Sequence, residues 1–247
     1  MSLKDEELTR YSRQIVLPQF GGVGQQRLKA ASVCVVGAGG IGCAVIPALA
    51  GAGLGRLTVI DGDTLDLSNL HRQPLYRSRE VGEPKAALAA QFVRRFNPFT
   101  DITPFEHRIT ADNAADLLAG HDLILDGTDN FATRLLVSDT AVRLGIPLVS
   151  AAAVQFQGQL GLFRGQPCYR CFVGDAFDSD DCDTCAELGV LGALTGSVGN
   201  AAALLAIRAL ARVGDDPAGK LHLFDGLTGA WRPMRLPPDP ECKACGR

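Results

Sequence analysis

A glycine-rich turn and a later carboxylate are the first features of the sequence that could do chemistry. Residues Gly37 to Gly42 (GAGGIG) match the pattern G-x-G-x-x-G, directly after the short apolar run SVCVV and before an apolar segment of helical character. Glycine lets the backbone approach a phosphate closely, and free N–H groups at a helix N-terminus favour an anion. Asp61 ends the next apolar run, where a carboxylate can bind ribose hydroxyls. Taken alone, these features predict a bound nucleotide and leave NAD and FAD open.

Polar side chains after the second apolar run favour a triphosphate over a dinucleotide. Asn69, Arg72, Gln73 and Lys85 supply several hydrogen-bond donors, whereas the glycine turn alone largely satisfies the diphosphate of a dinucleotide. Asp129, after the run DLILDGT, is placed to hold Mg²⁺ that bridges phosphates. Taken singly, Arg72 and Lys85 are equally well explained as solvated charges, and Asp129 as a helix cap. Their common position at strand ends favours a phosphate site.

Three C-x-x-C pairs point to a metal site. Two such pairs form a tetrahedral Cys₄ zinc site, with unrelated reduced thiols as the alternative. We favour the first and third pairs, because Gly246 follows the third in a tight turn and because this pairing ties the C-terminal segment to the body of the protein. Closing the long intervening loop adds little cost, since loop entropy grows logarithmically. The predicted ligands are Cys168, Cys171, Cys242 and Cys245; the remaining pair is Cys182 and Cys185, and Cys34 and Cys43 are expected to be small buried apolar residues.

Six segments resemble the MoeB/ThiF/HesA group, relatives of the ubiquitin-activating enzymes, in the same order and spacing: RYSRQIVLPQFGGVGQQRL, GAGGIGC, DGDTLDLSNLHRQ, EPKA, LDGTDN and ELGVLG. The resemblance covers practically the whole chain. It implies a homodimeric adenylyltransferase that uses ATP and Mg²⁺ to adenylate the C-terminal glycine of a small ubiquitin-like sulfur carrier protein with a Gly-Gly tail. A carboxylate that attacks the α-phosphorus is already ionised, so positioning and charge neutralisation suffice.

The resemblance also implies roles for individual residues. Arg72, Lys85 and Asp129 would be catalytic, and Asp129 would bind Mg²⁺. The Cys₄ site would hold a structural zinc ion. Arg13 would reach the nucleotide from the partner subunit, a role that only the resemblance supplies. The residues expected to bind the nucleotide are Gly39, Gly40, Gly42, Asp61, Asp63, Asn69, Arg72, Gln73, Lys85, Asp129 and Asn130.

Cys185 matches, through C-x-x-x-G-V, a cysteine that some members of the group use in covalent chemistry with the carrier or a sulfur donor. The neighbouring aspartates disfavour a thiolate, so both this role and metal binding by Cys182 and Cys185 stay open. Two departures from the group, His71 in place of glutamine and Gly127 in place of cysteine, remove no charge that the chemistry needs.

The elements that must position these groups alternate between strands and helices. Apolar runs at 32–36, 56–61, 122–130 and 147–153, separated by helical segments at 44–53, 83–96 and 131–144, predict a parallel sheet covered on both faces. The later segments QGQLGLF, LHLFDG and WRPMRL predict antiparallel strands around a helix at 198–213. Residues 5–30 suggest one or two helices around a loop from Pro18 to Gly24. The expected fold is a Rossmann-like doubly wound α/β fold with an antiparallel C-terminal extension.

We expect a single domain with a helical arm (1–30), a nucleotide-binding half (31–150) and a carrier-binding half (151–247). Carrier recognition is expected to use the later strands and the acidic loop 174–184. The 247 residues are 47% hydrophobic and 21% charged, which excludes wholesale disorder, and the net charge of −3 gives no basic surplus for nucleic acid.

The sequence also predicts where the protein works. No uninterrupted apolar run reaches the ~18 residues of a membrane span, and the charged N-terminus does not resemble a secretory signal. We therefore expect a cytoplasmic protein without membrane association. No rhodanese-like domain follows residue 247, so a sulfur donor is expected to be a separate protein. The alternatives are an NAD- or FAD-dependent oxidoreductase and a non-catalytic module that binds a carrier; the pathway, molybdopterin, thiamine or another, stays open.

Overall fold

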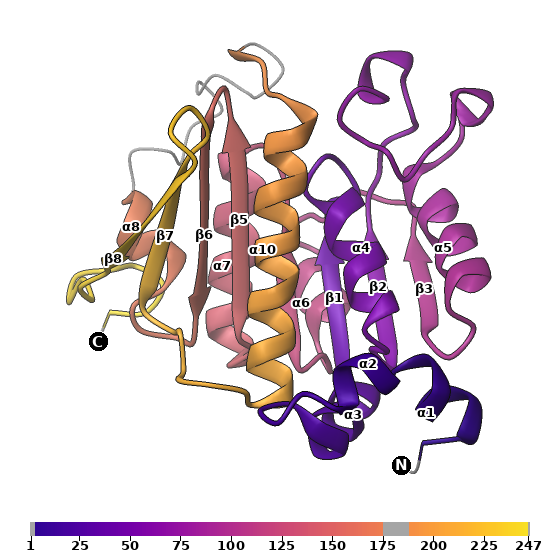
Figure 1. Ribbon diagram of the computed structural model, residues 1–247. Coiled ribbons are helices and arrows are strands. Elements are labelled where there is room, and N and C mark those ends of the chain that lie inside the picture. The colour runs from indigo at the N-terminus through magenta and orange to yellow at the C-terminus, as the bar shows by residue number, and fades with distance from the viewer. Residues whose placement is uncertain (1–2, 175–187, 247) are drawn as a thin grey trace.

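The computed structural model describes residues 3–174 and 188–246. Within them, one eight-stranded sheet has the order β3-β2-β1-β4-β5-β6-β7-β8, with helices on both faces (Figure 1). The strands are β1 (Ser32–Val36), β2 (Arg56–Ile60), β3 (Asp101–Phe105), β4 (Leu123–Asp126), β5 (Leu148–Val154), β6 (Gln157–Phe163), β7 (Lys220–Asp225) and β8 (Ala230–Arg235). The helices are α1 (Asp5–Arg10), α2 (Ser12–Ile15), α3 (Gly21–Ala30), α4 (Gly42–Gly51), α5 (Lys85–Phe96), α6 (Ala114–Leu118), α7 (Phe131–Leu144), α8 (Tyr169–Val173) and α10 (Gly192–Ala211), with 3₁₀ turns η1 (Leu67–Asn69) and η2 (Ser78–Glu80).

The strand directions confirm the predicted fold class. Strands β3, β2, β1, β4 and β5 are parallel, and β6, β7 and β8 continue the sheet in antiparallel pairs. Strand β1 has β2 on one side and β4 on the other, so the strand order reverses at β1. In open α/β sheets, ligands bind at the carboxyl ends of the strands at such a switch point. The topology therefore places a crevice above β1 and β4.

Each side of the sheet has its own hydrophobic core, which explains why the parallel strands are apolar throughout. Val33 and Val35 of β1 pack with α3, α4, α5 and α10, whereas Cys34 and Val36 pack with α6, α7 and α8. Successive side chains of a strand point to opposite faces. The β1 run SVCVV is therefore covered on both sides, and Cys34 is a buried apolar residue, as predicted.

Helix α10 is long and apolar enough to cross a membrane by length and composition alone, a test that the core helix of a soluble protein also passes. It packs against α4, β5 and β6 and covers one face of the sheet (Figure 1). It begins at Gly192, six residues before the predicted segment 198–213, which brings Thr195 into its first turn.

Several other local features differ from the sequence-based expectations. Helix α3 begins at Gly21, so the expected loop from Pro18 to Gly24 is wrong in its second half. Strand β3 and helix α6 were not predicted. Strand β3 carries a single buried residue, Ile102, and contains Pro104, which is tolerated because the strand lies at the edge of the sheet.

Candidate active site

The glycine turn joins β1 to α4 in a conformation that requires glycine. Gly37 has a φ of 93°, in the region that side chains other than glycine rarely adopt. A Cβ on Gly42 would lie 2.2 Å from the carbonyl oxygen of Gly37. Side chains at Gly37 and Gly42 would therefore strain the turn, which leads directly into the N-terminus of α4, as an anion site requires.

A cavity of about 290 Å³ lies above the carboxyl ends of the parallel strands. It brings together ten of the eleven residues predicted to bind a nucleotide. Gly42 lies behind the turn as the first, buried residue of α4. The predicted residues that line the cavity are Gly39, Gly40, Asp61, Asp63, Asn69, Arg72, Gln73, Lys85, Asp129 and Asn130.

Asp61 is fixed at the end of β2 by two backbone hydrogen bonds. Its carboxylate accepts from the N–H of Ala38, in the glycine turn, at 2.7 Å and from the N–H of Asp63 at 2.9 Å. Burial raises the pKa of Asp61, while these hydrogen bonds and the charge of Lys85 act in the opposite direction. The carboxylate is therefore preorganised beside the turn, where ribose hydroxyls are bound in related architectures.

Lys85 is buried at the first turn of α5 and makes an ion pair with Asp63, at 3.3 Å between Nζ and Oδ2. The other carboxylate oxygen of Asp63 pairs with Arg108 at 3.0 Å. Asp63 therefore holds two cations at the cavity, and it remains half exposed. Both cations are charged hydrogen-bond donors of the kind that phosphate oxygens accept from.

Arg72 is held in place by its own loop. Its Nη1 donates to the carbonyl oxygen of Ser68 at 3.1 Å and lies 2.9 Å from Nε2 of His71. A guanidinium can only donate, so Nε2 of His71 is the acceptor in this contact. Asn69 is buried in the same loop and accepts from the N–H of Asp66, while Gln73 is buried against the glycine turn.

The polar turn after β4 places Asp129 in the cavity. The helix cap of α7 is Asn130, whose Oδ1 accepts from the N–H of Thr133 at 2.8 Å. The alternative interpretation of Asp129 as the cap is therefore wrong, and its exposed carboxylate faces the cavity. Gly127 packs closely on Ile41, and a Cβ on Gly127 would lie 2.9 Å from Cγ2 of that side chain.

Arg13 does not line the cavity of its own chain. It is exposed on α2, next to Gln14, whose Nε2 donates to the carbonyl oxygen of Ala52 at the C-terminal end of α4. The glycine turn lies at the opposite end of that ten-residue helix, which spans about 15 Å. Within one chain, Arg13 is therefore on the far side from the crevice.

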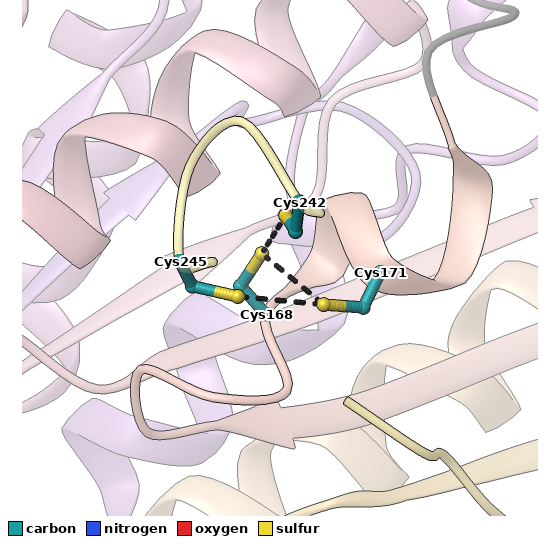
Figure 2. A group of neighbouring side chains, drawn as sticks. All are labelled: Cys168, Cys171, Cys242 and Cys245. Atoms are coloured by element: carbon teal, nitrogen blue, oxygen red, sulfur yellow. Dashed lines mark hydrogen bonds between the residues drawn. The ribbon is translucent and has the colours of Figure 1, made fainter. Parts of the chain in front are cut away.

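The first and third C-x-x-C pairs meet, as predicted (Figure 2). The sulfur atoms of Cys168, Cys171, Cys242 and Cys245 all lie within 4.8 Å of one another. Three of the separations are 3.4, 3.6 and 4.0 Å, close to the ~3.8 Å expected between thiolates around tetrahedral zinc. The N–H of Asp239 also donates to Sγ of Cys171 at 3.5 Å. The cluster fits a structural zinc ion. Cys182 and Cys185 lie outside the described residues.

Burial should make Cys34 and Cys43 unreactive. It raises the pKa of each thiol to about 12, so the nucleophilic thiolate is scarce at pH 8. We expect iodoacetamide at pH 8 to leave both residues unmodified in the folded protein and to modify both in denaturant, measured by peptide mass spectrometry. Rapid labelling of either residue in the folded protein would contradict the burial described here.

Several cavity residues were missed from the sequence. His107 and Arg108 follow β3, and because that strand was not predicted, its end was not recognised as part of the site. Thr195 was missed because α10 starts earlier than expected. Thr128 lies inside the motif LDGTDN but carries no charge. A search for polar residues after every strand, including weakly apolar edge strands, would have found the first two.

The sheet order, the glycine turn and the polar crevice define a nucleotide-binding protein of the doubly wound α/β class. The family comparison then identifies the group: the chain belongs to the ThiF family, which matches residues 11–244.

Relatives of known name agree with the enzyme class. The chain is 44% identical to a sulfur carrier protein adenylyltransferase of Thermus thermophilus, over 98% of this chain and 92% of that one. It is 42% identical to the molybdopterin-synthase adenylyltransferase of Salmonella typhimurium, over 99% of both chains. The predicted enzyme class, adenylyltransferase, is thus confirmed. The structure of Escherichia coli MccB with ATP shares the fold, with a TM-score of 0.85 and 22% identity over 98% of this chain and 75% of that one.

Proposed function

We propose that the protein uses ATP and Mg²⁺ to adenylate the C-terminal glycine carboxylate of a small ubiquitin-like sulfur carrier protein with a Gly-Gly tail. The observation that carries the proposal is the gathering of Arg72, Lys85 and Asp129 around the glycine turn in one cavity. A redox dinucleotide needs no such set of charges, which argues against the oxidoreductase alternative. The names of the relatives supply the class of carrier.

The reaction needs placement and charge neutralisation more than proton transfer. A carboxylate oxygen of the carrier forms a bond to the α-phosphorus, and the bond from that phosphorus to the bridging oxygen breaks, which releases pyrophosphate and leaves an acyl-adenylate. Gly39 and Gly40 hold phosphates with their backbone, and Asp61 binds the ribose. Arg72 and Lys85 stabilise the charge that develops on the departing pyrophosphate. Bound Mg²⁺, held by Asp129, would neutralise the phosphates and orient them.

The proposal extends to the assembly and its setting. As the family resemblance implies, Arg13 contacts the nucleotide from the partner subunit of a homodimer, a role that its place far from the crevice of its own chain allows. Residues 31–150 form the nucleotide-binding half and residues 151–247 the carrier-binding half, with zinc in the Cys₄ site as a structural ion. We place the enzyme in the cytoplasm, in cofactor biosynthesis for molybdopterin or thiamine. A covalent role of Cys185 stays part of this proposal.

The proposed reaction is tested by exchange of labelled pyrophosphate into ATP. Exchange should require both Mg²⁺ and a carrier protein from the source organism, and a carrier that lacks its last glycine should give none. Co-purification of a nicotinamide or flavin, with no exchange for any carrier, would favour the oxidoreductase instead. Binding of the carrier with no exchange would favour a non-catalytic module.

Asp61 offers a test of the ribose assignment. Asp61→Asn should weaken ATP binding about tenfold, because a charged hydrogen-bond acceptor of hydroxyl groups is worth roughly 1.5 kcal/mol or more. Equilibrium dialysis with labelled ATP measures the effect. Asp112→Asn, at an exposed position outside the cavity, serves as the control. Equal affinities for ATP and for 2′,3′-dideoxy-ATP in the wild-type protein would contradict the assignment.

A further inference from the structure

The turn between β4 and α7 is fixed by two buried charged side chains that the proposed reaction does not use. Asp126 is fully buried. One of its carboxylate oxygens accepts from the N–H of Thr128 at 3.0 Å and from the hydroxyl of Thr128 at 2.7 Å, and the other accepts from the hydroxyl of Ser150 at 3.1 Å. Thr128 is thus held at its N–H and its side chain.

Arg134 binds the carbonyl oxygen of Thr128. Its side chain is buried in the first turn of α7. The Nη2 group donates to the carbonyl oxygen of Thr128 and, at 3.1 Å, to that of Ala151 on β5. The Thr128 carbonyl belongs to the peptide group that leads into Asp129. The backbone position of Asp129 is therefore set by Arg134, while the Asp129 carboxylate itself faces the cavity.

The Arg134 side chain lies near α8, the helix that contains Cys171. Tyr169 of α8 is buried, and its hydroxyl makes no hydrogen bond within the described residues. Burial raises the pKa of Tyr169, and the Arg134 guanidinium acts against that rise. Arg170 pairs with Asp139 of α7 through two contacts, at 2.7 and 3.2 Å. Tyr169 and Arg170 belong to α8, which starts directly after Cys168. The Cys₄ cluster and the crevice are thus linked through α8, Arg134 and Thr128.

We propose that Arg134 is a positioning residue for Asp129, supported from behind by α8. The proposal rests on the proposed function in one respect, that Asp129 is the Mg²⁺ ligand. Both carbonyl oxygens accept from one nitrogen of Arg134, Nη2, which the long arginine side chain carries to a point between α7 and β5. A lysine keeps the charge, but its shorter side chain ends before that point, so the contacts to the two carbonyl oxygens lengthen and the turn can shift.

The test is a Mg²⁺ titration of ATP binding, with labelled ATP in equilibrium dialysis and no carrier present. Arg134→Lys should raise the Mg²⁺ concentration at half-maximal binding about tenfold, as for other residues that orient a metal ligand, and saturating Mg²⁺ should restore binding. Tyr169→Phe, which removes only the hydroxyl, should shift the midpoint in the same direction by a smaller factor. Arg143→Lys is the matched control, because Arg143 lies at the far end of α7 and donates to Thr140.

A merely structural role of Arg134 would lower the fraction of protein able to bind and leave the Mg²⁺ midpoint unchanged; that result overturns the proposal. Should Arg134→Lys fail to fold, a wild-type midpoint in Tyr169→Phe overturns it equally. The experiments distinguish failure of the proposed function from failure of the positioning role of Arg134. A wild-type protein that binds ATP with Mg²⁺ but never exchanges pyrophosphate defeats the proposed function and leaves this titration interpretable.

Discussion

Asp129→Ala is expected to lower carrier-dependent pyrophosphate exchange by at least about 100-fold, because it removes the carboxylate that anchors the divalent ion at the phosphates. The side chain is exposed in the cavity, and the helix cap beside it is supplied by Asn130. The substitution therefore takes away a charge without removing a structural contact of α7. The rate of exchange at saturating ATP, carrier and Mg²⁺ measures the effect.

Two controls separate this loss from a general defect. Asp112→Ala removes an exposed aspartate outside the cavity and should exchange at the wild-type rate. Asp129→Ala should also unfold at the wild-type temperature, since surface substitutions rarely change stability by more than about 0.5 kcal/mol. Exchange within tenfold of wild type in Asp129→Ala would remove Asp129 from the catalytic residues and, with it, the assignment of Mg²⁺ to this turn.

The parts of the site that follow predicted strands could be found from the sequence. Asp61 and Asp129 stand at the ends of β2 and β4, both strongly apolar runs. Because parallel strands end at the same edge of a sheet, their terminal residues had to meet. Arg108 escaped the same logic because β3 is a weakly apolar edge strand. Arg108 was missed because β3 was not recognised as a strand; the rule that residues after parallel strands meet at one edge of the sheet applies to it as well.

Buried charges were beyond sequence reasoning for a different reason. Arg134 lies in a helix whose pattern does not distinguish a buried arginine from a solvated one, and charged residues are exposed by default. Only the three-dimensional structure shows that its guanidinium reaches the carbonyl oxygens of Thr128 and Ala151. Asp63 was predicted to bind the nucleotide, but its ion pairs with Lys85 of α5 and with Arg108 after β3 are likewise visible only in three dimensions.

The choice between cysteine pairs was decided by chain connectivity and is confirmed by the structure. A Gly after the third pair allows its return turn: a Cβ on Gly246 would lie 2.5 Å from the carbonyl oxygen of Cys242. The Cys₄ cluster joins the end of the chain to α8, and α8 is locked to α7 by Arg170 and Asp139. We therefore expect loss of the Cys₄ cluster to lower the stability of the whole protein and not only that of the C-terminal segment.

Cys242→Ser is accordingly expected to lose bound zinc and to unfold on the order of 10 °C below the wild-type protein. Removing one thiolate from a four-ligand site forfeits most of the metal's contribution to folding, and about 3 kcal/mol or more corresponds to such a shift in a protein of this size. Zinc content by mass spectrometry and calorimetric unfolding measure the two effects. Glu241→Ser, at the preceding exposed position, should change neither.

Chelation supplies the complementary experiment on the wild-type protein. A strong zinc chelator should lower its unfolding temperature to that of Cys242→Ser and should have no further effect on the variant, because the same ion is removed by both routes. An additional drop in the variant would indicate a second zinc site in the chain. Full zinc content and a wild-type unfolding temperature in Cys242→Ser would show that the four sulfur atoms meet by packing alone, and the cluster would then no longer be a metal site.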